Sequence, residues 1–194
     1  MSDYMQLPEN LPVPVDDGAA DHLRGLTMPS VTLTATEGGE VDLGALRGLS
    51  VIYIYPMTGT PGVALPEGWD EIPGARGCTP ETCGFRDHFA ELRAAGADAV
   101  YGLSTQDSET QREFAERTRL PFALLADPGC ALDAAVGLPS FTAGGATRYS
   151  RLTLIIADGL IEHVFYPVFP PNAHAADVLA WLTARRSNAG GAAL

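Results

Sequence analysis

The sequence predicts a single α/β domain in which a mixed β-sheet is covered by helices on both faces. Apolar, β-branched segments typical of buried strands alternate along the chain with amphipathic segments typical of helices. A hairpin, marked by a turn at Asp158-Gly159, and a closing helix follow this alternating part. The 194 residues, of which 46% are hydrophobic, suffice for one sizeable core.

The patterns place each element within a few residues. We expect strands at 31–34, just after 37–40, and at 51–55, 99–103, 122–125, 152–156 and 160–165. We expect helices at 79–96, 108–117, 130–137 and 174–185, the second opened by a capping box at 108–111. Residues 139–149 are expected to form a loop.

Three further segments lie around or inside this domain. Residues 1–25 are rich in proline and acidic residues and are expected to form an extended arm, with the domain at 26–187 and a flexible tail at 188–194. Residues 62–77 form an insertion rich in Pro and Gly, which predicts no regular element. Because the insertion carries Leu65, Trp69 and Ile72, it is either a lid that packs on the domain or a tolerated surface loop.

Composition excludes several classes of function. The net charge of −12 and the pI near 4.5 oppose binding to the phosphate backbone of nucleic acids. Apolar runs are too short for a membrane span. The first residues lack the basic and apolar regions of a signal peptide, so we expect a cytoplasmic protein.

Two of the three cysteines, Cys78 and Cys83, point to redox chemistry. Cys78 stands at a predicted helix start, where unpaired N–H groups and the helix dipole stabilise a thiolate, and Gly77 lets the backbone bring those groups close. A thiolate is the form that attacks a peroxide oxygen. The remaining cysteine, Cys130, is expected to be a partly buried, inert thiol.

The spacing of the pair has a mechanical consequence. Five residues of regular helix separate two Cα atoms by about 8.7 Å on largely opposite faces. A disulfide requires Cα atoms within about 7 Å of each other. If the pair is catalytic, the first helical turns must therefore unwind during the cycle.

Other interpretations of these residues remain open. The two thiols could be unrelated, one in the core and one at the surface. A metal site lacks the second cysteine pair or the paired histidines that zinc sites use, so no metal is expected. His88 and His163 are expected to be packing or surface residues.

Residues 77–87, Gly-Cys-Thr-Pro-Glu-Thr-Cys-Gly-Phe-Arg-Asp, resemble the active-site helix of peroxiredoxins. The subfamily they resemble most is peroxiredoxin Q, also called bacterioferritin comigratory protein. Supporting matches occur at 103–105, 124–127, Arg151 and 161–165, and the resemblance covers roughly 27–185. It implies a thioredoxin fold with an N-terminal β extension.

The resemblance also implies roles for individual residues. Cys78 matches the peroxidatic cysteine and Cys83 the resolving cysteine, which together form an intramolecular disulfide that thioredoxin or a similar dithiol protein reduces. Glu81 matches a carboxylate of the same helix, and Arg151 matches an arginine that stabilises the thiolate. Arg148 competes with Arg151 for that role but is expected in a loop. No bound cofactor is implied.

The sequence departs from the family pattern just before Cys78. In the family, a Pro-x-x-x-Thr-x-x-Cys run ends at the peroxidatic cysteine. Here the run begins at Pro56 and includes Thr60, but Val63 stands where the cysteine belongs, so the insertion interrupts the motif. Thr60 is the first candidate for the hydroxyl near the sulfur, with Arg76 and Thr79 as substitutes.

The prediction is a thiol peroxidase for hydrogen peroxide and small organic hydroperoxides, a monomer or weak homodimer. One alternative is a thioredoxin-type disulfide oxidoreductase, which the C-x4-C spacing disfavours. The other is a non-catalytic redox-sensing module of the same fold, which the interrupted motif favours.

Overall fold

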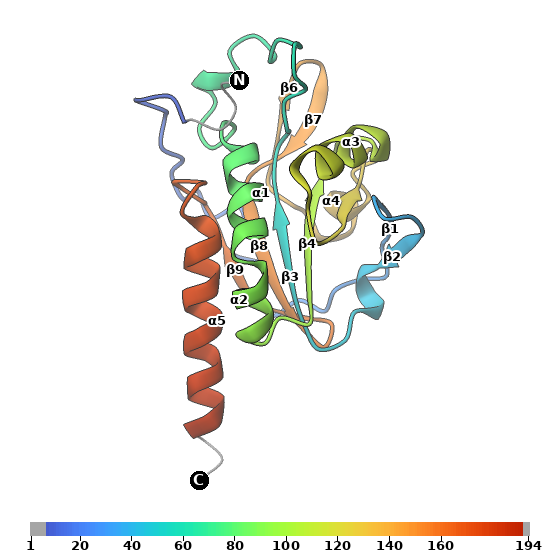
Figure 1. The fold of residues 1–194 in the computed structure, drawn as a ribbon, viewed down its shortest axis with the longest axis vertical. Helices are drawn as coiled ribbons and strands as arrows, with labels where there is room; N and C mark the ends of the chain where they lie inside the picture. The colour runs from blue at the N-terminus through green and yellow to red at the C-terminus, as the bar shows by residue number, and fades with distance from the viewer. Residues whose placement is uncertain (1–6, 192–194) are drawn as a thin grey trace.

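The computed structural model describes residues 7–191 and contains a seven-stranded sheet with the strand order β2-β1-β5-β4-β3-β8-β9 (Figure 1). The strands are β1 (Thr32–Ala35), β2 (Glu40–Asp42), β3 (Leu49–Ile54), β4 (Ala99–Ser104), β5 (Leu124–Ala126), β8 (Leu152–Ala157) and β9 (Leu160–Phe165). Strands β3, β4 and β5 are parallel, whereas the outer pairs are antiparallel. The sheet is therefore mixed, which confirms the predicted α/β class.

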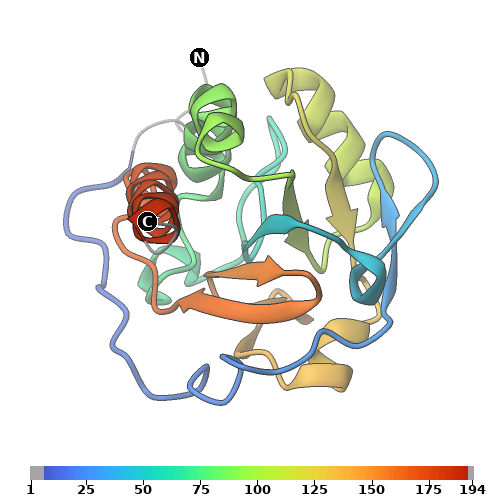
Figure 2. The same ribbon diagram turned by 90° about the horizontal axis from the view of Figure 1, so that it is seen from below.

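Helices cover both faces of the sheet, as Figure 2 shows when the molecule is seen from below. They are α1 (Cys78–Asp87), α2 (Phe89–Ala94), α3 (Ser108–Thr118), α4 (Ala131–Val136) and α5 (His174–Gly191). Every residue of β3 is buried, and successive side chains alternate between two cores. Ile52 and Ile54 join the core that includes α4, and Val51 and Tyr53 join the core of α1, α2, α3 and α5.

The expected loop at 139–149 is wrong, because these residues form a hairpin of β6 (Ser140–Ala143) and β7 (Ala146–Tyr149). Gly144 and Gly145 connect the strands with φ values of +60° and +73°. Two consecutive positive φ values are the geometry of a tight hairpin turn, and glycine adopts them without steric cost. The Gly-Gly pair is thus the signal for this turn in the sequence.

The helix boundaries also differ from the expected ones. The helix expected at 79–96 divides at His88, whose φ and ψ of −92° and 5° separate α1 from α2. The capping box expected at 108–111 is wrong, because the cap of α3 is Asp107, whose carboxylate accepts the backbone N–H of Thr110. Helix α5 continues from the expected end at 185 to Gly191.

The N-terminal arm and the insertion both pack on the domain. Ala20 and Leu23, near the end of the arm, are buried in the core that includes α4. The insertion contains a single 3-10 turn at Trp69–Glu71 and otherwise lacks regular structure. Trp69 and Ala75 are buried in a small apolar cluster with Ala143 of β6. Within 7–191, no helix is long and apolar enough to cross a membrane.

Phe85 joins α1 to the sheet and supplies a test of this packing. Its ring is fully buried and stacks on Tyr53 of β3 with centroids 4.2 Å apart. Phe85→Ala is expected to lower the free energy of unfolding by about 3–5 kcal/mol, measured by urea denaturation, because it leaves a cavity in the core. Phe89→Ala, at a partly buried position of α2, should lower the free energy of unfolding clearly less than Phe85→Ala does. Equal losses would contradict this packing.

Candidate active site

Cys78 is the first residue of α1, which begins beyond the carboxyl end of β3. The preceding Gly77 has a φ of +103°, which a residue with a side chain rarely adopts. A Cβ atom at Gly77 would also lie 2.3 Å from the Pro171 side chain. Glycine is thus required for the chain to enter α1 here, and the Cys78 side chain is buried at the helix N-terminus.

Strand pairing brings Arg151 to Cys78 from a distant part of the sequence. Strand β8 runs antiparallel to β3 with Leu152 opposite Ile54, so Arg151 lies at the edge of the sheet where β3 ends. Its Nη2 atom donates a hydrogen bond of 3.1 Å to the Cys78 sulfur. The two residues that the sequence assigned to the thiolate and its cation are therefore in direct contact.

The other donors of Arg151 hold the end of the insertion and α1. Arg151 forms a buried ion pair with Glu81, which lies one turn along α1 from Cys78. It also donates to the backbone oxygens of Gly74, Ala75 and Arg76 at 3.2, 3.3 and 3.1 Å. The planar guanidinium spreads these contacts over its three nitrogens: Nε donates to Gly74, Nη1 faces Glu81, and Nη2 shares its two hydrogens among the Ala75 oxygen, the Arg76 oxygen and the Cys78 sulfur.

Burial and the positive charge of Arg151 shift the pKa values of Cys78 and Glu81 in opposite directions. Burial raises the pKa of the Cys78 thiol, and the negative charge of Glu81 acts in the same direction. The positive charge of Arg151, together with hydrogen bonds from the Met57 backbone and from Arg151, opposes this rise in the pKa. Burial likewise raises the pKa of Glu81 to about 7, against the charge of Arg151. The positive charge of Arg151 thus stabilises the ionised forms of both Cys78 and Glu81. A proton on Glu81 removes its negative charge and therefore favours the Cys78 thiolate.

Cys83 lies in α1 together with Cys78, and neither cysteine forms a disulfide. Cys83 is also buried, and burial raises the pKa of its thiol, against the charges of Arg86 and Arg117. Because the helix is continuous between the two residues, the sulfurs are held apart as the spacing argument requires.

A small cavity of about 20 Å³ adjoins the Cys78 side chain. Its lining residues come from the segment after β3, the insertion and the start of α1: Met57, Gly59, Leu65, Trp69, Arg76, Gly77, Cys78 and Thr79. Thr60, the first candidate for a hydroxyl near the sulfur, is exposed and lies outside this lining. The two substitutes, Arg76 and Thr79, both line it.

The remaining candidates are less directly placed than Arg151, or they serve in packing. Arg148 is partly buried on β7, where burial lowers the pKa of its guanidinium and the charge of Cys78 opposes this, but the hydrogen bond to the sulfur comes from Arg151. Cys130 precedes α4, and burial raises the pKa of its thiol. His163 stacks on Trp181, and His88 pairs with Glu91 at the surface. The described residues contain no group of three or more His, Cys, Asp or Glu that could hold a metal ion.

Two supports of the site have no clear signal in the sequence. The amide of Gln106, just beyond β4, accepts the Thr58 backbone N–H at 2.8 Å and donates to the Thr58 oxygen at 3.1 Å, which fixes the segment before the insertion. Buried His174 hydrogen-bonds Thr153 at 2.7 Å, and burial together with Arg151 lowers the pKa of His174 to about 3. Both depend on contacts between distant segments.

Known proteins share this sequence and architecture. The Redoxin family model matches residues 23–180. The chain is 34% identical over 161 residues to chloroplastic peroxiredoxin Q of Sedum lineare, covering 82% of this chain and 77% of that protein. It is 36% identical over 159 residues to peroxiredoxin Bcp of Escherichia coli strain K12, covering 79% and 91%. The chain spans 64% of the longer chloroplastic peroxiredoxin Q of Triticum aestivum.

Solved structures agree with the sequence matches. Peroxidoxin BcpB from Mycobacterium tuberculosis superposes with a TM-score of 0.66 at 29% identity, covering 83% of this chain and 96% of that one. Xanthomonas campestris peroxiredoxin Q, at 23% identity and a TM-score of 0.63, shares the fold and covers 91% and 98%. These neighbours confirm the predicted thioredoxin fold. The chain belongs to the Redoxin family and, within it, to the peroxiredoxins of the Q and Bcp group.

Proposed function

We propose that this chain is a thiol peroxidase that reduces hydrogen peroxide and small organic hydroperoxides through Cys78, with Cys83 as the resolving cysteine. The observation that carries the proposal is the hydrogen bond of 3.1 Å from Arg151 to the Cys78 sulfur at the start of α1. This arrangement stabilises negative charge on a buried sulfur that adjoins a cavity. Membership of the peroxiredoxins supports the same chemistry.

In the first step, the Cys78 thiolate attacks one oxygen of the peroxide. A sulfur–oxygen bond forms, the oxygen–oxygen bond breaks, and the sulfur becomes a sulfenic acid. The leaving hydroxide or alkoxide takes up the proton that the thiol released, so the products are the sulfenic acid and water or an alcohol. The Arg151 guanidinium lies where it can stabilise negative charge on the sulfur and on the peroxide oxygens.

In the second step, the Cys83 thiol displaces water from the Cys78 sulfenic acid and forms an intramolecular disulfide. Because an intact α1 holds the two residues apart, its first turns must unwind before the bond can form. Unwinding moves Cys78 and Glu81 away from Arg151. A dithiol reductant, thioredoxin or a protein like it, then cleaves the disulfide by thiol–disulfide exchange and is itself oxidised.

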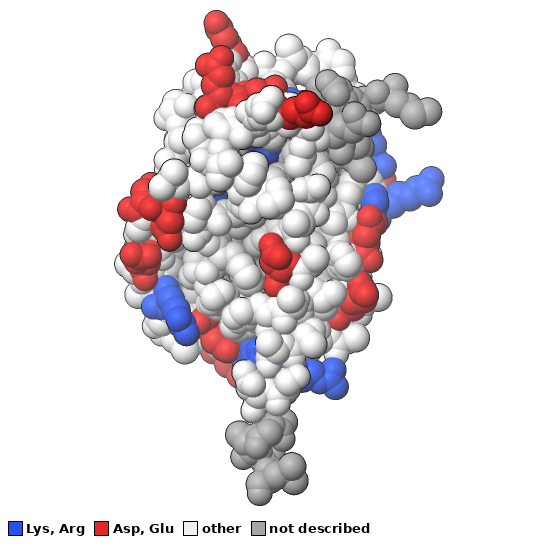
Figure 3. All heavy atoms as spheres, turned by 90° about the vertical axis from the view of Figure 1, so that its left-hand side faces the viewer, with Lys and Arg blue, Asp and Glu red and all other residues white. Residues whose placement is uncertain are grey.

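The remaining expectations on partners and location belong to this proposal. The chain is proposed to act in the cytoplasm as a monomer or weak homodimer, without nucleic acid or membrane. On the face shown in Figure 3, acidic side chains lie at the top and along both sides with one near the centre, and basic ones lie mainly near the edges. With the net charge of −12, this distribution supports a protein partner rather than a polyphosphate.

The cysteine variants test the cycle. Cys78→Ser is expected to abolish peroxide consumption coupled to thioredoxin and thioredoxin reductase, because it removes the attacking sulfur. Cys83→Ser should consume one equivalent of peroxide and then stop at a sulfenic acid that dimedone traps. Cys130→Ser, the matched control, should keep the full rate.

Full activity of Cys78→Ser would contradict the proposed role of that residue. A wild-type protein that ignores peroxide but reduces insulin disulfides would instead be a disulfide oxidoreductase. Oxidation of Cys78 without turnover would identify a redox-sensing module.

A pair of arginine variants tests the contact to the sulfur. Arg151→Lys keeps the charge but loses the guanidinium that holds the sulfur, Glu81 and the insertion at once, so kcat/KM for hydrogen peroxide should fall about 100-fold. Arg148→Lys makes the same chemical change on the neighbouring hairpin and should have little effect, because Arg151 makes the sulfur contact. Similar losses in the two variants would contradict the assignment.

A further inference from the structure

We propose that the insertion at 62–77 selects substrates by size, with Leu65 and Trp69 walling the cavity at Cys78 so that hydrogen peroxide is favoured over bulky organic hydroperoxides. This inference rests on the proposed peroxidase function and deepens it. The insertion interrupts the motif that precedes the peroxidatic cysteine in the family pattern, so it enters the site at the position where substrate must approach.

The Trp69 side chain is fixed in place. Only 3% of it is exposed, and its ring packs against Phe141 of β6 with centroids 6.0 Å apart. Its backbone N–H donates to the Pro66 oxygen at 3.1 Å, and its own oxygen accepts the Ile72 N–H at 3.3 Å. Since the hairpin and the 3-10 turn both hold the ring, Trp69 is a rigid wall.

The far end of the insertion is anchored to the catalytic residues themselves. Arg151 holds the three backbone oxygens of residues 74–76, and Arg76 forms an ion pair with Asp70 at 3.1 Å across the loop. The insertion is therefore held at two places, by Arg151 beside Cys78 and by the packing of Trp69 against Phe141. Such fastening favours the lid that the sequence left as one of two alternatives.

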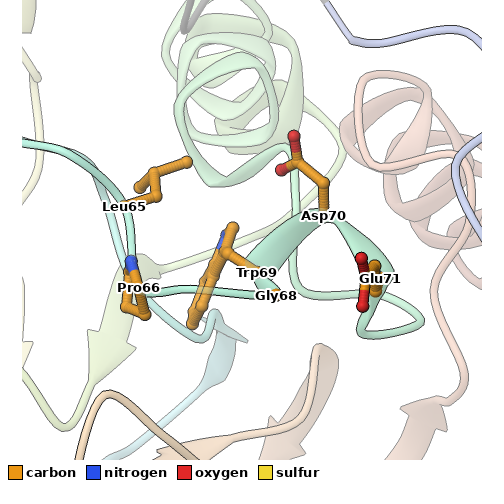
Figure 4. Close-up of a pocket in the computed structure, with 6 residues that line it drawn as sticks. All are labelled: Leu65, Pro66, Gly68, Trp69, Asp70 and Glu71. Atoms are coloured by element: carbon orange, nitrogen blue, oxygen red, sulfur yellow. The ribbon is translucent and has the colours of Figure 1, made fainter.

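Leu65 and Trp69 separate two spaces of very different size. On the inner side is the cavity of about 20 Å³ at Cys78, and on the outer side is an open hollow of about 210 Å³. Both spaces are lined by Leu65 and Trp69. Figure 4 shows the outer hollow, with Leu65, Pro66 and the Trp69 ring on one side and Asp70 and Glu71 on the other. Truncating either wall residue should join the two spaces.

The inner volume sets the selectivity. A cavity needs about 10–15 Å³ to admit one water molecule, so the inner space accepts a molecule of nearly that size. Hydrogen peroxide needs only a small adjustment of the walls, whereas a branched or aromatic alkyl group must displace Leu65 or Trp69. Pocket walls that reject one extra methylene change kcat/KM by roughly 10–200-fold.

The test compares cumene hydroperoxide with hydrogen peroxide in three alanine variants. In Trp69→Ala and Leu65→Ala, the ratio of kcat/KM for cumene hydroperoxide to that for hydrogen peroxide should rise about 10-fold or more. Ile72→Ala is the matched control, because Ile72 belongs to the same loop and the same apolar cluster but lines neither space. In Ile72→Ala, the ratio of kcat/KM for the two peroxides should equal that of the wild type.

Two results would overturn the proposal: an unchanged ratio in both wall variants, or an equal rise in Ile72→Ala, which would indicate general loosening of the loop. Failure of the proposed function is distinct, because the wild type would then consume neither peroxide. Alkylation of Cys78 in a Cys83→Ser, Cys130→Ser background gives a second readout that needs no peroxidase activity. Trp69→Ala should increase the rate of Cys78 alkylation by a bulky maleimide more than the rate of alkylation by iodoacetamide. Equal increases would contradict the proposal that Trp69 limits access by size.

Discussion

The buried contact of Arg151 with Glu81 and Cys78 is the constraint on which the rest of the site depends. Charges taken out of water are tolerated only when they are paired and hydrogen-bonded, and here one guanidinium faces a carboxylate, a sulfur and three backbone oxygens. These partners come from β8, α1 and the insertion. If one of these elements moves, Arg151 therefore loses a partner and a buried charge is left unpaired.

In the proposed cycle, this coupling links the chemical step to the unwinding of α1. While Cys78 carries a thiolate, attraction to Arg151 holds the first turn of α1 in place. Oxidation to a sulfenic acid removes that negative charge and weakens the attachment, just when Cys83 must approach. The bonds of Arg151 to the backbone oxygens of residues 74–76 do not involve the sulfur, so the end of the insertion stays attached when the first turn of α1 is released. The proposed cycle therefore requires α1 to be intact while peroxide reacts and unwound for the resolving step.

The sequence predicted the chemistry better than the surroundings of the sulfur. Local signals located the strands and the helix start at Cys78, because apolar periodicity and glycine preferences act over a few residues. Residues 139–149 were expected to form a loop but form a hairpin, for which the Gly144-Gly145 turn is a local signal. The backbone oxygens held by Arg151, the clamp of Gln106 on Thr58 and the exposure of Thr60 were out of reach, since each depends on how distant segments pack. The sequence left the insertion as either a packed lid or a tolerated surface loop, and it contains no signal for the contact of Trp69 with Phe141.

The most direct measurement of the central claim is hydrogen–deuterium exchange of α1 before and after one equivalent of hydrogen peroxide. The reduced protein should protect the backbone amides of α1 from Glu81 onward, and oxidation should remove that protection while α5 keeps its own. The same sample, digested and analysed by mass spectrometry, should contain a disulfide between Cys78 and Cys83. Formation of that disulfide with α1 still fully protected would contradict the account.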